Sequence, residues 1–227
     1  MQYYWTGVQL LMTEVLIMSD HARAQFINAG LRLYPQYGYY KLSIRLLAAE
    51  AGLSPGMFHH LFADKNIFIH EVLETQHEKT FGRLNLSGLE GNALVKLKNS
   101  LQMLAFCIRD NLDWVRRAFA DSGEGAEIVA GFWRQNFSLQ TEYFLDLLAA
   151  CGTLEEAEQV HRLAYLSSSV IGPMVIGMRL SEMGVLSDAL GAHIPDILSD
   201  EAICRRIDWA LAALFPDERL FLVEGQV

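Results

Sequence analysis

Two pairs of residues in this chain have the spacing of a metal-binding carboxylate site. Glu74-x-x-His77 and Glu158-x-x-His161 would each place a carboxylate and an imidazole on one face of a helix, as in di-iron bundles. Because Glu and His are frequent here, such pairs arise by chance, and a metal-carboxylate enzyme is kept only as an alternative. The sequence lacks the GxSxG, HExxH, P-loop and Rossmann glycine patterns, so we expect no catalytic residue, no metal and no cofactor.

A different chemistry is predicted by residues 42–62, LSIRLLAAEAGLSPGMFHHLF. A helix from Ser43 to Ala51, a tight turn at Gly52-Leu53 and a helix from Ser54 to about His60 form a helix-turn-helix. Glycine accepts the positive φ that such a turn requires. In this motif the second helix enters the major groove of DNA. The side chains on its N-terminal and outer face are therefore the ones expected in the groove. Those residues are Ser54, Pro55, Met57, His59 and His60.

Residues 26–68, FINAGLRLYPQYGYYKLSIRLLAAEAGLSPGMFHHLFADKNIF, resemble the N-terminal DNA-binding domain of TetR-family transcriptional regulators. The matching residues are Ala29, Leu33, Gly38-Tyr39, Ser43-Ile44-Arg45, Ala48, Ala51-Gly52-Leu53-Ser54, Gly56, Phe62 and Lys65. The resemblance implies a homodimer, a helical C-terminal effector domain and release from an operator when a small molecule binds. The chain departs from the family at Met57, His59 and Leu61, so a second alternative is a ligand-binding protein of this fold that no longer binds DNA.

The resemblance also implies which residues contact double-stranded operator DNA. Ser43 corresponds to a phosphate-contacting helix cap, Arg45 to a base or phosphate contact, and Gly56 to a point where the backbone approaches DNA closely. Lys65 is expected to contact a phosphate beside the helix N-terminus that Asp64 caps. The complete candidate set is Ser43, Arg45, Ser54, Pro55, Gly56, Met57, His59, His60 and Lys65.

Composition and charge fit a globular protein with a mildly basic DNA-binding domain. Hydrophobic residues make up 52% of the 227 residues, and three widely spaced cysteines indicate neither a disulfide framework nor a zinc finger. The net charge is −9, yet residues 19–65 carry five basic and three acidic side chains. An acidic body with a basic N-terminal domain favours phosphate contact through that domain alone.

Helical periodicity continues through nearly the whole chain, which predicts an all-α protein of about nine helices. The first helix is expected to start at a Ser19-Asp20 cap and to end near Pro35 and Gly38. Beyond Gly91 the expected helices span about 92–111, 124–150, 154–181 and 199–215, the third kinked at Gly172-Pro173. The expected domains are an extension at 1–18, a DNA-binding domain at 19–65, a connecting helix at 66–84, and an effector-binding and dimerisation bundle at 85–227.

The C-terminal bundle is rich in aromatic residues and methionines, which predicts a pocket for a largely apolar small molecule. The candidate ligand-binding residues are Met103, Phe106, Phe132, Trp133, Asn136, Phe137, Gln140, Tyr165 and Met174. The resemblance places the dimer interface on the last two long helices. The apolar residues expected there are Leu163, Leu166, Val170, Met174, Ile203, Ile207, Ala210, Leu211 and Leu214.

Residues 1–18 contain no Lys or Arg, so they lack the basic region of a signal peptide. They are interpreted either as an extension upstream of a start at Met18 or as an additional amphipathic helix. No segment reaches the ~18 apolar residues of a membrane span. The sequence therefore predicts a cytoplasmic protein without a membrane partner. The function predicted for the chain is that of a transcriptional repressor, which a small, largely apolar ligand releases from its operator.

Overall fold

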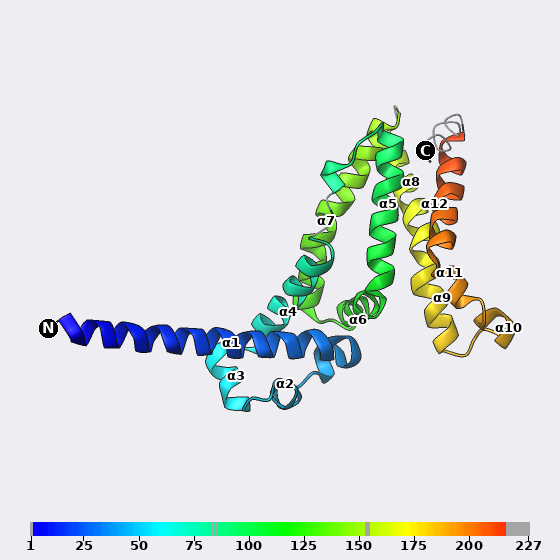
Figure 1. Ribbon diagram of the computed structural model, residues 1–227. Coiled ribbons are helices and arrows are strands. Elements are labelled where there is room, and N and C mark those ends of the chain that lie inside the picture. Colours follow the sequence, from blue (N-terminus) through cyan, green and yellow to red (C-terminus); the bar gives the residue numbers. More distant parts are fainter. Residues whose placement is uncertain (1, 83, 85, 153–154, 217–227) are drawn as a thin grey trace. The chain divides into compact units, whose positions relative to one another are not determined.

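The computed structural model describes residues 2–82, 84, 86–152 and 155–216; the side chains of residues 2–17 and 87 lie outside that description. The described residues contain helices and no strand, which confirms the all-α prediction (Figure 1). The helices are α1 (Gln2–Lys41), α2 (Ile44–Ala51), α3 (Pro55–Leu61), α4 (Lys65–Thr80), the 3-10 turn η1 (Leu86–Gly88), α5 (Ala93–Asp110), α6 (Leu112–Gly123), α7 (Glu127–Ala150), α8 (Glu156–Val170), α9 (Gly172–Glu182), α10 (Asp188–Gly191), α11 (Ile194–Ile197) and α12 (Asp200–Leu214).

Helix α1 differs from expectation at its start. Ser19 does not cap it, because the helix is continuous from Gln2 and Ser19 lies in its interior. The helix was expected to end near Gly38, and the regular helix does stop there: Gly38 has non-helical angles (φ 65°, ψ −178°) and bends the chain. A short helical segment then continues to Lys41. Pro35 lies inside the helix. Because the helix already runs through the residues before Ser19, the backbone N–H groups that a cap would satisfy have intrahelical partners.

Helices α2 and α3 form the expected helix-turn-helix. Ser43 and Ser54 are N-caps whose hydroxyl oxygens accept from the backbone N–H groups of Leu46 (3.2 Å) and Met57 (3.3 Å). Gly52 ends α2 with left-handed angles (φ 68°), so the turn uses the freedom that only glycine has without strain. The predicted boundaries are confirmed to within a residue.

Two further elements show where periodicity alone is insufficient. Helix α6 was not among the expected helices, although it fills residues between two that were. The expected long helix at 154–181 is divided into α8 and α9, which are bent by 43° at Gly172-Pro173, as the sequence predicted. These breaks, with the short helices α10 and α11, raise the helix number above the expected nine.

The chain divides into two compact units. The first contains Met1–His77 and Arg117–Trp133, and the second contains Glu78–Arg116 and Arg134–Val227. Helices α6 and α7 each contribute residues to both units. The first unit therefore contains α1 to α3, most of α4, the second part of α6 and the start of α7.

The core of the first unit is a cluster of four phenylalanines. Phe58 lies 5.5 Å from Phe26 and 5.2 Å from Phe68, measured between ring centroids. Phe62 lies 5.0 Å from both Phe58 and Phe68. All four residues are essentially inaccessible to solvent. Three of these four contacts are edge-to-face, a geometry that adds to the free energy gained by burying the rings.

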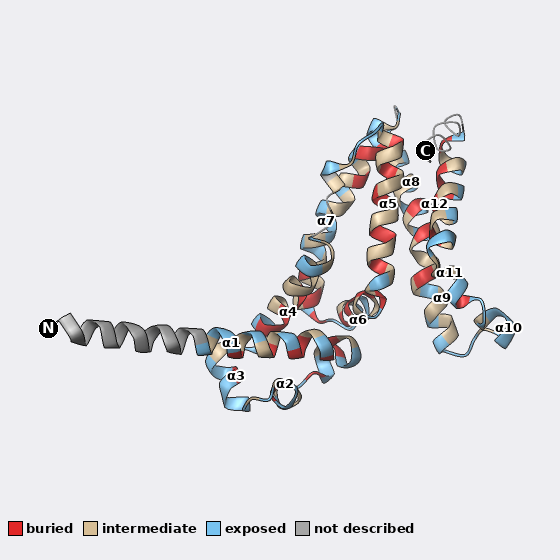
Figure 2. Ribbon diagram, in the orientation of Figure 1, coloured by how far each residue is buried: buried red, intermediate tan, exposed pale blue. Residues whose placement is uncertain are grey.

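The second unit is organised around α12, which packs against α5 and α8. Buried residues line the inner faces of these helices, and exposed ones lie on the outer side of α12 (Figure 2). Among the described residues no single helix is long and apolar enough to cross a membrane. The bent pair α8–α9 meets that test together, by length and composition alone.

Candidate nucleic-acid interface

Eight of the nine candidate DNA-binding residues are exposed on α2, α3 and the caps that precede them. We call these eight residues the reading surface; they are Ser43, Arg45, Ser54, Pro55, Gly56, Met57, His59 and His60. The burial of Phe58 explains this arrangement, because its ring occupies the inward face of α3 and turns the residues on either side of it outward. Both histidines are exposed, where the sequence required at least one to be.

The two serine caps are compatible with contact to phosphate. Each hydroxyl oxygen accepts one hydrogen bond from a backbone N–H at the start of its helix. Its own proton remains available to donate to an anion. Capping and phosphate contact are therefore not alternatives at Ser43 or Ser54.

Gly56 has no steric role within the protein. A Cβ atom built on it would meet only the Ser54 hydroxyl oxygen, at 3.8 Å, which is an ordinary contact. Its φ is not positive, so alanine would fit the backbone equally well. Neither packing nor backbone angles within the chain require glycine at position 56, so any such requirement must come from a molecule that binds this surface.

Lys65 is placed differently from the rest of the set. It is half-buried, and its ammonium group donates to the carbonyl oxygen of Tyr39 and lies 4.7 Å from the centre of the Tyr39 ring. Burial lowers the pKa of Lys65. Lys65 therefore ties the start of α4 to the end of α1, and its availability to a phosphate is reduced.

Arg23 is a positioning residue that sequence reasoning missed. Its guanidinium pairs with Glu71 on α4, donates to the carbonyl oxygen of Leu61 (2.7 Å) and lies 4.6 Å from the centre of the Phe62 ring. One side chain thereby joins α1, α3 and α4 at the end of the recognition helix. No short motif signals this role, because the partners are 38 and 48 residues away in sequence.

A buried carboxylate, Asp121 on α6, fixes the bend at Gly38. Its side chain is 1% exposed, accepts from the backbone N–H of Tyr39 (2.7 Å) and pairs with Arg117 (2.6 Å). A Cβ on Gly38 would collide with Arg117 and Asp121, so glycine permits this close approach. Burial raises the pKa of the nearby Tyr34 hydroxyl, and the Asp121 carboxylate raises it further. In the sequence, only the i, i+4 spacing of Arg117 and Asp121 indicates that these two residues pair.

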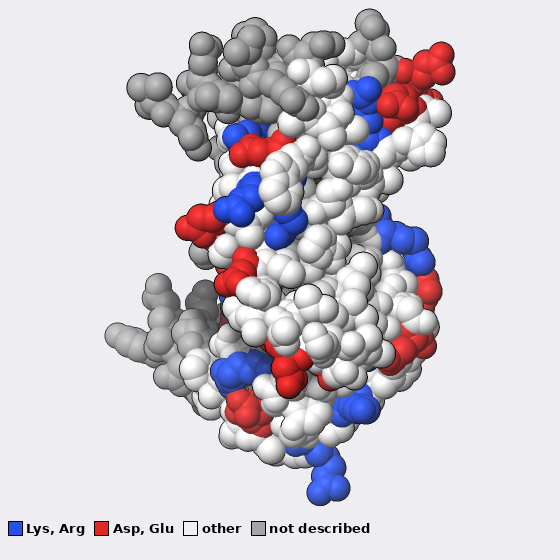
Figure 3. Space-filling model, turned by 90° about the vertical axis from the view of Figure 1, so that its right-hand side faces the viewer, with Lys and Arg blue, Asp and Glu red and all other residues white. Residues whose placement is uncertain are grey.

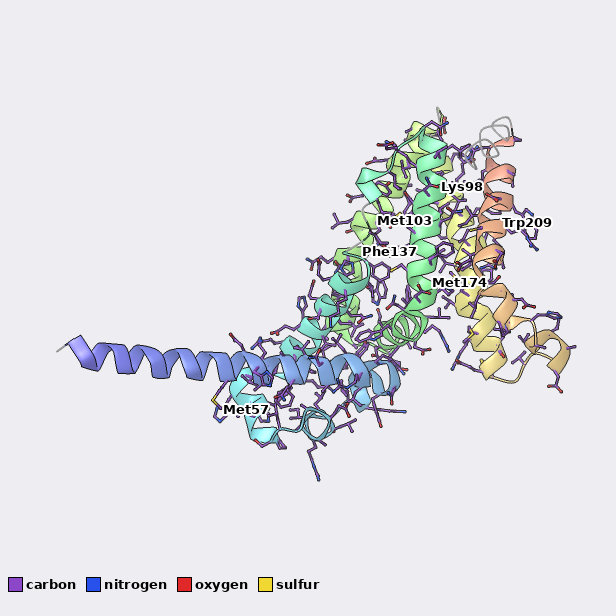
Figure 4. The ribbon with its side chains drawn as sticks, viewed as in Figure 1. Met57, Lys98, Met103, Phe137, Met174 and Trp209 are labelled. Carbon is purple, nitrogen blue, oxygen red and sulfur yellow. The ribbon has the colours of Figure 1, made fainter. Side chains whose placement is uncertain are left out.

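The candidate ligand-binding residues lie in both units. Phe132 and Trp133 belong to the first unit, where Phe132 contacts His77 (5.7 Å) and Trp133 stacks on Phe119 (4.7 Å). In the second unit Met103, Phe106, Asn136 and Gln140 are half-buried, Phe137 and Tyr165 are exposed, and Met174 is fully buried (Figure 4). Their shared role as a pocket remains a prediction.

The two Glu-x-x-His pairs are not assembled into a metal site in the described part of the chain. Glu158 pairs with Arg162 (2.9 Å), and Glu74 lies 3.7 Å from His70. No group of three or more His, Cys, Asp or Glu side chains with metal-binding geometry occurs among the described residues.

Sequence comparison identifies the family. Residues 26–72 match the family described as bacterial regulatory proteins, tetR family, and this segment contains the whole helix-turn-helix. The N-terminal domain of the chain is therefore a TetR-family DNA-binding domain. This domain supports a DNA-binding transcriptional regulator. A comparison with curated protein sequences finds no match.

Solved structures extend the likeness from the DNA-binding domain to the rest of the fold. A transcriptional regulator from Pseudomonas aeruginosa PAO1 is 18% identical, with a TM-score of 0.63 over 87% of this chain and 91% of that one. A TetR-family regulator from Mesorhizobium loti is 16% identical, with a TM-score of 0.58 over 86% and 97%. A regulator from Saccharomonospora viridis in complex with choline is 16% identical, with a TM-score of 0.57 over 79% and 96%.

We predict that Gly56→Ala separates folding from DNA binding in this protein. The added methyl group should leave the free energy of unfolding unchanged or raise it by about 0.5 kcal/mol, because alanine is the better helix former. It should weaken binding to a selected operator duplex by about 1–2 kcal/mol, since the group would intrude on a close contact. Urea unfolding and fluorescence anisotropy measure the two effects. Gly123→Ala, which also meets open space, is the control; wild-type affinity in Gly56→Ala would contradict the assignment.

A second prediction concerns the buried carboxylate. Asp121→Asn keeps the shape of the side chain but leaves Arg117 without its closest charge, so the free energy of unfolding should fall by about 2–3 kcal/mol. The loss is below that of a fully buried pair because Arg117 is 25% exposed and also lies 3.4 Å from Glu124. Asp113→Asn, on the same helix and 82% exposed, should change stability by less than about 0.5 kcal/mol. Equal urea midpoints for the two variants would exclude this role for Asp121.

Proposed function

We propose that this protein is a homodimeric, cytoplasmic repressor that a small, largely apolar ligand releases from its operator. The observation that carries the proposal is the reading surface. All eight residues of this surface are exposed on one helix-turn-helix, and Phe58, which lies between Met57 and His59, anchors the recognition helix in the core. In this motif that helix enters the major groove and its N-terminal residues meet the base edges.

Affinity for DNA should rest on few cations in each subunit. The reading surface contains one guanidinium, Arg45, which is exposed and has no ion-pair partner in the described part of the chain. Arg32, by contrast, pairs with Glu50 (2.6 Å). A single subunit would thus neutralise few phosphates, which favours a dimer that doubles the contacts.

The surface proposed for the dimer lies on α8, α9 and α12. The apolar residues expected there from the sequence mostly face inward: Leu166, Val170, Met174, Ile203, Ile207, Ala210 and Leu211 are buried within the second unit. The exposed apolar side chains on the same helices are Val160, Tyr165, Ile176 and Trp209. Uncharged side chains dominate the middle of the corresponding face in Figure 3. An exposed apolar area of this kind favours contact with a second copy.

A ligand that releases DNA must bind the two conformations with different affinity. Changing operator occupancy from about 99% to 1% requires roughly 5.5 kcal/mol, or a little under 3 kcal/mol for each of two pockets. Reciprocity requires operator DNA to weaken ligand binding by the same factor, which a titration with and without operator measures. The choline-bound structure of a protein with this fold supports a small organic molecule as the effector class.

The DNA-binding proposal predicts a specific loss in Arg45→Ala. Operator affinity should fall by about 1–3 kcal/mol, and discrimination should relax at one base pair of each half-site if the guanidinium contacts a base. Arg32→Ala removes the same charge from a residue already paired with Glu50, and it should bind nearly as wild type does. The measurement is anisotropy on a duplex selected from a random pool by the full chain. If Arg32→Ala and Arg45→Ala lose the same affinity, only net charge matters and the assignment of Arg45 is refuted.

The dimer proposal predicts dissociation in Trp209→Glu. The Trp209 side chain is 65% exposed on α12, so a charge there should not disturb the core but should disfavour burial in an interface. Sedimentation velocity should show wild-type dimers and largely monomeric Trp209→Glu at the same micromolar concentration. Leu139→Glu, at an equally exposed apolar position on α7 (66%), should remain dimeric. A monomeric wild type, or a fully dimeric Trp209→Glu, would contradict this interface.

A further inference from the structure

The recognition helix lacks the side chains that read bases by paired hydrogen bonds. In the major groove Arg or Lys pairs with guanine, and Asn or Gln pairs with adenine. The residues from Ser54 to Leu61 include none of these four types. The exposed members of this segment are Ser54, Pro55, Gly56, Met57, His59 and His60. Base selection by α3 must therefore involve another chemistry.

Met57 is the apolar member of this set that can reach away from the helix. Its side chain is exposed (39%) and points away from the first unit (Figure 4). The three residues before it have short or no side chains, so Met57 is the first long side chain of the helix. Its backbone is fixed, because its N–H donates to the hydroxyl oxygen of Ser54 (3.3 Å) and to its carbonyl oxygen (3.1 Å).

The residue that follows Met57 determines its orientation. Phe58 is fully buried against Phe26, Phe62 and Phe68, so α3 cannot rotate to bring Met57 into the core. An apolar side chain held in water at the tip of a DNA-reading helix gains free energy only if the groove offers it an apolar group. The C5-methyl group of thymine is the apolar group that a base pair presents in the major groove.

We propose that Met57 contacts the C5-methyl group of a thymine in the major groove and thereby selects an A·T pair at one position of each operator half-site. The proposal rests on the proposed function, since it requires α3 to enter the groove. The thioether chain is unbranched and polarisable, so it can adapt to the methyl group without a fixed hydrogen-bond geometry. Deoxyuridine presents the same hydrogen-bonding atoms as thymidine and lacks only the C5-methyl group. Replacing thymine by uracil therefore isolates the contact proposed for Met57.

The test removes that methyl group from the DNA. The full-length protein selects operator duplexes from a random pool, and each thymine of the selected duplex is then replaced in turn by deoxyuridine in both half-sites. Anisotropy at fixed salt gives the affinity of wild type and of Met57→Ala. At one thymine position wild-type binding should weaken about fourfold for each methyl group removed, the factor that corresponds to one buried methylene-sized group. Met57→Ala should bind the thymine and uracil duplexes equally at that position.

Two control variants show whether the effect belongs to Met57. His60→Ala, on the same helix, should bind more weakly overall but keep the loss on uracil substitution. Met183→Ala, a 60% exposed methionine of the second unit, should behave as wild type. Wild-type binding that is insensitive to uracil at every thymine, or equal sensitivity in Met57→Ala, would overturn the Met57 assignment while DNA binding stands. Failure to enrich any duplex would overturn the proposed function, and this inference with it.

Discussion

Contact between aromatic rings of α1, α3 and α4 is the constraint on which the rest of the first unit depends. Phe58 projects from the middle of α3 into a cluster with Phe26 and Phe68, and Phe62 closes the cluster at the end of the helix. Neighbouring residues of a helix diverge by about 100°, so this one anchor fixes the rotation of α3. Met57, His59 and His60 are exposed as a consequence. The part of the reading surface on α3 is therefore exposed because Phe58, on the opposite face of the helix, is buried in the core.

Polar interactions of the first unit also help to position α3 and α4. Arg23 joins α1, α3 and α4, and Lys65 joins the start of α4 to Tyr39. Asp121 fixes the bend that precedes α2, with Arg117 as its partner. Together with the Arg32–Glu50 pair, these contacts use four of the six Lys and Arg side chains of the first unit for internal structure. In the described part of the unit Arg45 and Lys41 remain exposed without an ion pair, and so few free cations favour the proposed dimer, which would double the phosphate contacts.

The sequence predicted the helix-turn-helix closely because its signals are local. Serine caps, the glycine turn and the period of buried residues all act within a few residues of one another, and they agree. Local signals carry less information where a distant partner holds the side chain. Lys65 appeared available for phosphate from its place at a helix start, but Tyr39 binds its ammonium group.

The same reason explains why most apolar residues expected at the dimer interface are buried within the second unit. An apolar stripe on α8 and α12 does not reveal whether it meets the rest of its own chain or a second copy. Here Leu166 and Ile207 pack inside the unit, while Trp209 is exposed. Ser19 likewise has the residue type of a cap but lies within a longer helix. The ligand-binding residues cannot be judged by pattern, because the aromatic and methionine content that predicts a pocket also fills a core.

Hydrogen exchange of the full-length protein with and without a selected operator duplex tests the central claim most directly. If the reading surface meets DNA, deuterium uptake should fall in peptides that span residues 43–61, which contain α2, the turn and α3. Peptides from α5 and α12 should show no comparable change. Unchanged uptake at residues 43–61, with protection elsewhere in the chain, would contradict the account.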